Sequence, residues 1–288
     1  MSRHRIAFLF IAATVATTLA ATVAVSAVRA GGTAGSTASS MRALAGVNFV
    51  SGCGFSHRRP DDSIVYPGQP GRSHDHSFVG NVSTNAFSTL GSLRAAASTC
   101  RRPGDTAGYW MPTLLVDSQP VAPTAATIYY RRSTLAAPQA FPAGLKIVAG
   151  SAQSIAAQDL RVVFWNCGVD GGVRPSSLPP TCANTTTEAL RLHVTFPSCW
   201  DGRNLDSLDH KSHMAYPTRG LCPASHPVPV PAITLIYRYP TTGGPLTALA
   251  SGSAITGHAD FFNAWNQHEL TRLVTTCLDA LRHCGRGD

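Results

Sequence analysis

The sequence is poor in charged residues, and two charged types are almost missing. Asp, Glu, Lys and Arg make up 13% of the 288 residues, and the chain has only two glutamates, Glu188 and Glu269. Glycoside hydrolysis by paired carboxylates would therefore have to use aspartates. Lysine is equally rare, so the net charge of +8 comes mainly from arginines scattered along the chain. Because no basic run interleaved with aromatic residues occurs, we expect no nucleic-acid partner.

Several motifs of known chemistry are also absent. The sequence has no G-x-S-x-G nucleophile elbow, no phosphate-binding glycine loop and no C-x-x-C pair. These absences argue against an elbow-type serine hydrolase, a phosphate-loop protein and a cysteine-ligated zinc cluster. No repeat of fixed period occurs. After the predicted export signal, no segment is apolar over a length that could span a bilayer.

The chain begins with a pattern typical of an export signal. A basic start, MSRHR, precedes an apolar stretch over residues 6–27, and small residues precede Ala27 and Ala30. We predict that residues 1–30 are a cleaved signal peptide and that the protein is secreted. An uncleaved membrane anchor is the alternative, because the apolar stretch is long. Residues 31–44 are predicted to be a flexible Gly/Ser/Ala linker and residues 45–288 a single domain.

All eight cysteines follow the predicted signal. An even number of cysteines behind an export signal predicts four disulfides. Spacing alone only ranks the pairings, and it favours cysteines that are close in sequence. The expected pairs are Cys53 with Cys100, Cys167 with Cys182, Cys199 with Cys222, and Cys277 with Cys284.

Short apolar, β-branched or aromatic runs bounded by Pro, Gly and Ser recur through the chain. They cover residues 47–53, 109–116, 127–132, 145–150, 160–166, 188–196, 233–239 and 246–255. This pattern predicts a mainly β domain, an antiparallel β-sandwich or jelly-roll-like fold with long disulfide-stapled loops. We expect a short helix within residues 88–97.

The C-terminal end has helical periodicity instead. Asn266 and Glu269 have the spacing of a capping box. They precede an apolar face that should pack on the sheet, formed by Leu270, Leu273, Val274, Cys277, Leu278 and Leu281. The sequence therefore predicts one amphipathic helix that closes the domain.

The stretch FPSCWDGRNLDSLDHKSHMAYP, residues 196–217, concentrates ionisable side chains more than any other. It contains Asp201, Asp206, Asp209, His210, Lys211 and His213. Such side chains can bind a metal or move a proton, whereas a solvated charged turn is the alternative interpretation. Lys211 fits better as a contact for an anion or a hydroxyl than as a neighbour of a cation, because like charges repel.

Two further motifs carry histidines. His74 and His76 stand two residues apart, so on an extended backbone both imidazoles project from one face and could share a transition metal. Structural or substrate-binding histidines are the alternative. His258 with Asp260 could be a ligand pair, or an acid/base histidine oriented by a carboxylate. His226 alone fits a structural role more readily than a functional one.

Three motifs together resemble a known family. SHDHSFVGN (73–81), PSCWDGRNLDSLDHKSHMAYP with CPASHPV after it (within 196–228), and GHADFFNAWN (257–266) are similar to the secreted domain of unknown function nineteen ninety-six of actinobacteria and fungi. The match covers about residues 47–284. The family has no established activity, but its fungal members are often joined to WSC-type carbohydrate-binding modules. The resemblance therefore implies a cell-wall or extracellular polysaccharide partner.

The resemblance also implies which polar residues recur in the family. Carried over by position they are His74, His76, Asp201, Asn204, Asp206, Asp209, His210, Lys211, His213, His226, His258 and Asp260. Because these residues lie in motifs far apart in sequence, we expect them to converge on one face.

Our hypothesis is a secreted protein with a His/Asp cleft that acts on extracellular or cell-wall polysaccharide as a metal-assisted hydrolase. A single divalent transition metal is expected at His74, His76 and His210. The expected catalytic groups are Asp209, His210, Lys211, His213, His258 and Asp260. The expected substrate contacts are Trp200, Asp201, Asn204, Asp206, Tyr216, His226 and Trp265. The alternatives are a non-catalytic carbohydrate- or wall-binding module and an extracellular nuclease or phosphoesterase; the oligomeric state stays open.

Overall fold

The structure, a computed structural model, describes residues 39–168 and 174–285. The predicted signal peptide, residues 1–30, lies outside these ranges, as does most of the predicted linker. Residues 39–43, near the end of the predicted linker, are helical, and Met41 lies against Gly220. No helix in the described ranges is long and apolar enough to cross a membrane.

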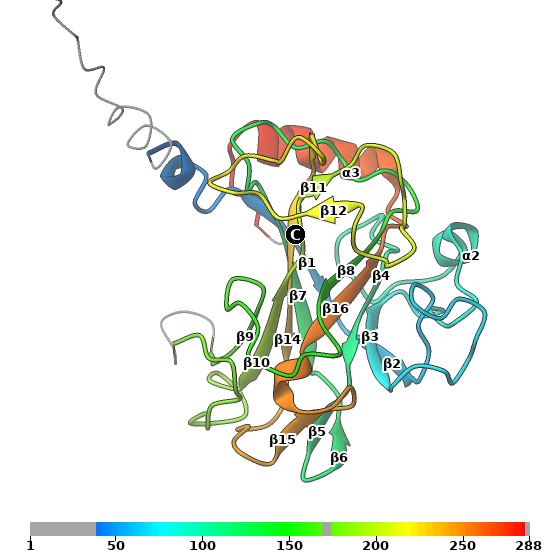
Figure 1. Ribbon diagram of the computed structural model, residues 1–288, viewed down its shortest axis with the longest axis vertical. Helices are drawn as coiled ribbons and strands as arrows, with labels where there is room; N and C mark the ends of the chain where they lie inside the picture. Colours follow the sequence, from blue (N-terminus) through cyan, green and yellow to red (C-terminus); the bar gives the residue numbers. More distant parts are fainter. Residues whose placement is uncertain (1–38, 169–173, 286–288) are drawn as a thin grey trace, which may run out of the picture.

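Two five-stranded sheets pack face to face as a β-sandwich (Figure 1), and all their strand pairs are antiparallel. The first sheet has the order β1 (Asn48–Cys53), β7 (Ala125–Arg131), β14 (Ala232–Arg238), β10 (Leu190–Thr195) and β9 (Val163–Cys167). The second sheet has the order β2 (Phe55–Arg59), β3 (His76–Gly80), β4 (Gly108–Pro112), β16 (His258–Phe262) and β8 (Lys146–Gly150). The predicted mainly β, antiparallel fold is confirmed.

Smaller elements close the ends of the sandwich. One three-stranded sheet consists of β12 (Met214–Ala215), β11 (Cys199–Trp200) and β13 (Val228–Pro229), and the other of β15 (Thr247–Leu249), β5 (Leu114–Val116) and β6 (Gln119–Val121). The helices are α2 (Leu90–Ala95), the 3₁₀ turn η1 (Ala254–Thr256), α3 (Gln267–Leu273) and the π-helical turn η2 (Val274–Asp279). Helix α3 lies across one end, beside β11 and β12, while α2 lies outside the second sheet (Figure 1).

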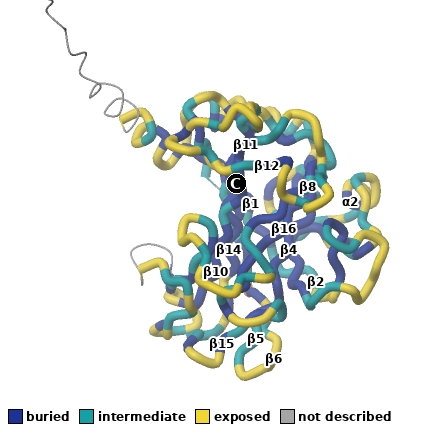
Figure 2. The backbone as a smooth tube through the Cα atoms, in the orientation of Figure 1, coloured by how far each residue is buried: buried dark blue, intermediate teal, exposed yellow. Residues whose placement is uncertain are grey.

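Alternation along the strands assigns each side chain of the second sheet to one of two faces. In β16, Ala259 and Phe261 belong to the main core between the sheets. Phe262 belongs instead to a smaller apolar cluster on the outer face, together with Phe78, Trp110, Val148, Ile64 and Leu93. The strands of both large sheets are mostly buried, and the exposed segments are the connecting loops (Figure 2). The outer face of the second sheet is therefore covered as well.

A buried polar network ties the two sheets together. The hydroxyls of Tyr109 on β4 and Tyr130 on β7 hydrogen-bond to each other. Trp265 donates its indole N–H to Tyr130 at 2.8 Å, and Asp105 accepts hydrogen bonds from Tyr109 at 2.9 Å and from Ser51 at 2.6 Å. Trp265 is fully buried, so it offers no stacking face to a sugar, contrary to the role predicted from sequence.

The predicted C-terminal helix is confirmed, with two differences. The Asn266 side chain accepts a hydrogen bond from the Glu269 backbone N–H at 3.1 Å, as an N-cap does. The Glu269 carboxylate does not complete the capping box, because it pairs with Arg272 instead. Leu281, expected on the apolar face, lies beyond the end of η2 and is half exposed. The buried face otherwise follows the predicted spacing.

All four predicted disulfides are present, namely Cys53–Cys100, Cys167–Cys182, Cys199–Cys222 and Cys277–Cys284. The bond Cys199–Cys222 closes the loop that carries the ionisable stretch. Because a disulfide limits the conformations open to the unfolded chain, it stabilises such a long loop without requiring a core of its own.

The charge state of Asp105 should make stability depend on pH. Burial raises the pKa of Asp105 from 3.8 to about 7. Between these values the unfolded chain releases a proton that the folded chain keeps, so the free energy of unfolding falls as pH rises. Asn has the shape of the neutral carboxyl and does not ionise. The free energy of unfolding of Asp105→Asn should therefore rise relative to that of the parent, by on the order of 2–4 kcal/mol as the pH increases from 4 to 7.

Urea unfolding at four pH values in this range measures the difference. Asp159→Asn is the surface control, because hydrogen bonds from Arg161 lower the pKa of Asp159 to about 2, outside the range. Parallel pH profiles for Asp105→Asn and the parent would contradict the prediction.

Candidate metal centre

Three histidines meet on the outer face of the second sheet. His76 is the first residue of β3 and His258 the first residue of β16, with Pro112 of the intervening strand in register with His76. His74 precedes β3 by two residues. The ring centroids of His74 and His76 are 4.2 Å apart, and that of His258 is 4.9 Å from His74. The two imidazoles of the H-x-H motif therefore lie together, as the sequence predicted.

The hydrogen bonds of two of these rings determine which nitrogen is free. His76 Nδ1 lies 3.0 Å from the Asp61 carbonyl, and His258 Nδ1 lies 2.9 Å from the Thr256 carbonyl. Since a carbonyl only accepts, both Nδ1 atoms carry hydrogen and both Nε2 atoms present lone pairs.

The three Nε2 atoms converge. His258 Nε2 lies 3.1 Å from His74 Nε2 and 3.5 Å from His76 Nε2. The lone pairs of His76 and His258 cannot hydrogen-bond to each other, but a shared cation would satisfy both. Zn–N bonds of about 2.0–2.1 Å at tetrahedral angles place two nitrogens about 3.4 Å apart. The two observed distances are close to this value, and one ligand atom from each of the three histidines lies within 4.8 Å of the others.

Burial keeps these histidines neutral. It lowers the pKa of His258 to about 3 and that of His74 to about 4. The pKa of His76 is lowered well below its ordinary value, first by burial and then by the neighbouring histidines. Neutral imidazole is the form that binds metals, so the site does not have to lose protons near neutral pH before a metal binds.

Two carboxyl groups lie beside the histidines. Ligand atoms of Asp62, His76 and Asp260 lie within 4.8 Å of one another, and all three residues are buried. Asp62 accepts hydrogen bonds from two backbone N–H groups, whereas neither oxygen of Asp260 has a hydrogen-bond partner within the described ranges. Burial raises the pKa of both carboxyls. A buried carboxyl with two unsatisfied oxygens calls for a water or a cation.

Asp62 did not stand out in the sequence. It lies in the segment SHRRPDD, whose composition indicates only a turn. Its position after β2 could have identified it. Strand β2 pairs with β3, and the last residue of β2 is in register with His76.

The ionisable loop of residues 200–217 folds over the edge strand β8. His213 Nε2 lies 2.7 Å from the Lys146 carbonyl, and Lys211 Nζ donates to the Gly150 carbonyl at 2.5 Å. Gly150 is in register with His258, so Lys211 stands at the border of the cluster. Burial is the main cause of the lowered pKa of His258, and the positive charge of Lys211 adds to that effect. The same charge offsets part of the rise that burial causes in the pKa of Asp260.

A family comparison covers most of the chain. The sequence profile described as Domain of unknown function (DUF1996) matches residues 62–265, which include the three histidines and both carboxyls. The chain belongs to this family. No curated protein and no solved structure matches the chain. The buried cluster of histidines and carboxyls is therefore the feature of this DUF1996 domain that best indicates its chemistry.

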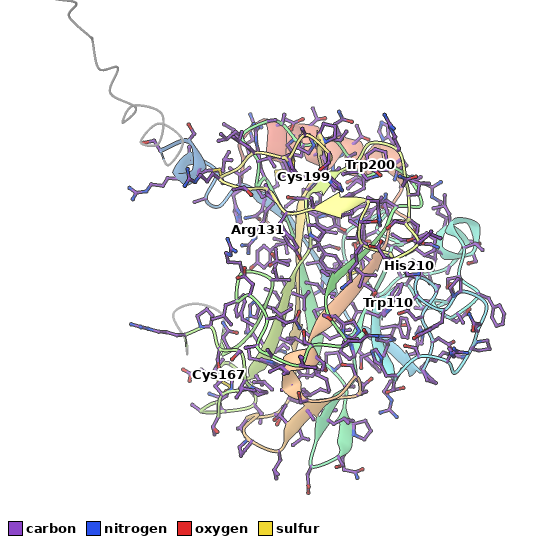
Figure 3. The ribbon with its side chains drawn as sticks, viewed as in Figure 1. Trp110, Arg131, Cys167, Cys199, Trp200 and His210 are labelled. Atoms are coloured by element: carbon purple, nitrogen blue, oxygen red, sulfur yellow. A yellow bond between two sulfur atoms is a disulfide. The ribbon has the colours of Figure 1, made fainter. Side chains whose placement is uncertain are left out.

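His210, predicted as a metal ligand, is held elsewhere in the DUF1996 domain. Its Nδ1 lies 2.8 Å from Asp206, which also pairs with Lys146. Figure 3 labels His210 close to Trp110, which lies on β4 of the second sheet. His258 rather than His210 completes the trio with His74 and His76.

Other predicted residues of the loop stabilise its turns. Asp201 accepts hydrogen bonds from the backbone N–H groups of Arg203 and Asn204, and Asp209 accepts from those of Lys211 and Ser212. Those bonds hold the pKa of Asp209 below its ordinary range. These contacts assign both aspartates to the folding of the loop.

Two aromatic or imidazole groups also hold loop segments in place. Trp200 donates its indole N–H to the Asn204 carbonyl at 2.6 Å. His226 Nε2 lies 2.8 Å from the Ser212 carbonyl, which connects the following loop to the ionisable stretch. These contacts make Trp200 and His226 supports of the ionisable loop.

Tyr216 lines a groove at the edge strand β8. The groove has a volume of about 390 Å³, and its lining includes Val148, Gly150 and Lys211. Val148 is in register with Asp260 on the neighbouring strand, but no residue of the histidine cluster and neither carboxyl lines the groove. A second hollow of about 300 Å³ shares Tyr216 and continues the groove. Tyr216 is 41% exposed, and its hydroxyl donates a hydrogen bond to the Thr195 carbonyl at 2.8 Å.

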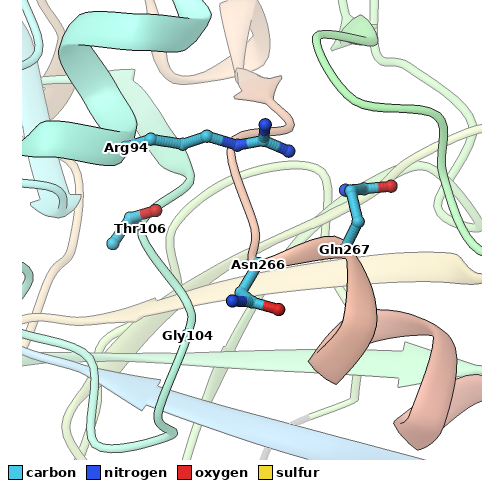
Figure 4. A pocket seen from close by; sticks show the side chains of 5 residues that line it. All are labelled: Arg94, Gly104, Thr106, Asn266 and Gln267. Atoms are coloured by element: carbon cyan, nitrogen blue, oxygen red, sulfur yellow. The ribbon is translucent and has the colours of Figure 1, made fainter.

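A separate polar pocket lies near the start of α3. Its lining residues are Arg94, Gly104, Thr106, Asn266 and Gln267 (Figure 4), and its volume is about 390 Å³. Arg94 donates to the Trp265 carbonyl at 3.2 Å, which occupies part of its guanidinium. No residue of the histidine cluster lines this pocket.

Metal binding should depend on His258 and not on His210. The His258→Ala variant loses one of the three nitrogen ligands. Loss of a residue that only hydrogen-bonds a ligand lowers metal affinity by about 10–100-fold, so the affinity of this variant for Zn²⁺ or Co²⁺ should fall by more than about 100-fold. His210→Ala should bind within about threefold of the parent. Calorimetric titration, with the exposed His268→Ala as a matched control, measures these affinities.

An equal loss of affinity in His210→Ala and His258→Ala would contradict the assignment of the trio. Unchanged binding in His258→Ala would show that the metal binds elsewhere.

Proposed function

We propose that this DUF1996 domain is a metal-dependent hydrolase that acts on extracellular or cell-wall polysaccharide. The convergence of three Nε2 atoms on one point carries the proposal. Three protein ligands on a tetrahedral ion leave one position for water or substrate, as in catalytic zinc sites. A metal bound in that way supplies an acidified water and a Lewis acid.

Asp260 is the group best placed to handle a proton. Hydrolysis of a glycosidic bond transfers the hydroxyl of water to the anomeric carbon and a proton to the departing oxygen. Both oxygens of Asp260 lack hydrogen-bond partners in the described part of the chain, and Asp62 lies beside them. Because burial raises the pKa of Asp260, its neutral carboxyl can donate the proton that the departing oxygen takes up. The carboxylate left behind can then accept the proton of the attacking water, while Asp62 is held by two backbone N–H groups.

The groove along β8 suits a chain-like substrate. It extends from Lys211 past Tyr216 into the second hollow. An exposed ring held by its own hydroxyl can stack on a sugar face without losing much conformational freedom. Lys211 and the ion pair of Arg161 with Asp159 add polar contacts along this path. Four disulfides fit an oxidising, extracellular location, where cell-wall polysaccharide occurs.

The decisive experiment measures the release of soluble reducing ends from insoluble cell-wall polysaccharide by the metal-loaded protein. Asp260→Asn should lower kcat at least about 100-fold and still bind the metal, because Asp260 is proposed to move a proton and not to hold the ion. The exposed His268→Ala variant is the control and should keep full activity.

The possible outcomes separate the hypotheses. Metal binding and polysaccharide binding without any reducing ends would overturn the hydrolase and favour the non-catalytic binding module. Full activity of Asp260→Asn would remove that residue from the mechanism.

Tyr216→Ala tests the groove. Loss of one stacking contact, which contributes about 0.5–1.5 kcal/mol, should raise KM by about 2–10-fold and leave kcat nearly unchanged. Steady-state kinetics on soluble oligosaccharides measure both constants. Unchanged kinetics would place the substrate outside this groove.

A further inference from the structure

The groove along β8 and the buried carboxyls of the candidate site are neighbours that side chains keep apart. Asp260 is 1% exposed, whereas Lys211 and Tyr216 in the groove are exposed. Val148 lines the groove and also belongs to the buried apolar cluster of the second sheet. It is in register with Asp260, and alternation places both side chains on the outer face. Val148 therefore forms part of a wall between the groove and this carboxyl.

Lys211 forms another part of this wall. It lines the groove, and its Nζ donates to the carbonyl of Gly150, the residue in register with His258. Its positive charge acts on both His258 and Asp260. Lys211 thus borders the groove on one side and lies close to the buried cluster on the other.

The segment that carries this lysine, residues 201–213 of the ionisable loop, has few attachments to the second sheet. Within the described ranges, the hydrogen bonds between the segment and the sheet all end on Lys146 or Gly150. Lys146 pairs with Asp206 at 3.3 Å through its Nζ and accepts a hydrogen bond from His213 at 2.7 Å through its carbonyl. The segment can therefore separate from the sheet without breaking any pairing between strands.

Hydrogen bonds within the segment hold its own turns together. Asp201 and Asp209 each accept hydrogen bonds from two backbone N–H groups of the segment. The disulfide Cys199–Cys222 fixes the base of the loop. The segment can therefore move as one body on a fixed base.

We propose that residues 201–213 form a lid that opens to join the groove to the histidine cluster and its two carboxyls. A polymer in the groove cannot touch Asp260 through a wall of side chains, so a conformational step has to precede any reaction there. Opening moves Lys211 away from Gly150 and removes one side of that wall. The need for the lid rests on the proposed function, whereas its opening can be measured without substrate or metal.

The test measures access to His258 in the metal-free protein. Diethyl pyrocarbonate acylates a neutral imidazole nitrogen, and His258 Nε2 carries a free lone pair. Lys211→Met removes one attachment of the lid and keeps the length of the side chain. Arg203→Met is the matched control, because Arg203 is an exposed cation of the same segment whose side chain makes no hydrogen bond to the sheet within the described ranges. Mass spectrometry of the modified peptides follows His258, with the exposed His268 as an internal reference.

We expect His258 to react about 3–10-fold faster in Lys211→Met than in the parent, because the loss of an attachment raises the population of the open state. In Arg203→Met it should react within about twofold of the parent rate. His268 should react equally in all three proteins. Equal rates at His258 in Lys211→Met and the parent, or an equal rise in Arg203→Met, would overturn the lid. A parent in which His258 reacts as fast as His268 would also overturn it, because the site would then already be open.

Hydrogen exchange measures the opening independently. The backbone N–H of Lys146 donates to the Leu205 carbonyl at 2.9 Å, so it is protected only while the lid is closed. Its exchange should accelerate in Lys211→Met, whereas the amides that pair β8 with β16 should keep their rates. Unchanged exchange at Lys146 would contradict the lid even if the protein hydrolyses polysaccharide. Faster exchange without any release of reducing ends would support the lid and overturn only the proposed function.

Discussion

The alternation of side chains along β3 and β16 is the constraint on which the candidate site depends. Because successive residues of a strand point to opposite faces, Ala259 and Phe261 enter the core only if His258 and Asp260 point outward. A shift of one residue would move an imidazole and a carboxyl into the sandwich and two apolar side chains out of it. The core between the sheets thus determines where the chemistry lies.

The cluster on the outer face of the second sheet is buried, and this burial determines the protonation of its side chains. An apolar cluster and the loop over β8 cover the face, so the histidines stay neutral and the carboxyls of Asp62 and Asp260 resist ionisation. Burial of so many polar groups is costly unless they are satisfied. The disulfides and the network around Tyr109 and Tyr130 provide stability that offsets this cost.

The sequence by itself determined the features that depend on local spacing. The strand runs, the disulfide pairs, the N-cap at Asn266 and the common face of His74 and His76 follow from periodicity and from neighbours in the chain. Only the tertiary structure decided which distant residues meet. It replaced His210 with His258 and added Asp62. Strands far apart in sequence pair in the register that buries their apolar side chains, and this register leaves no local pattern in the sequence.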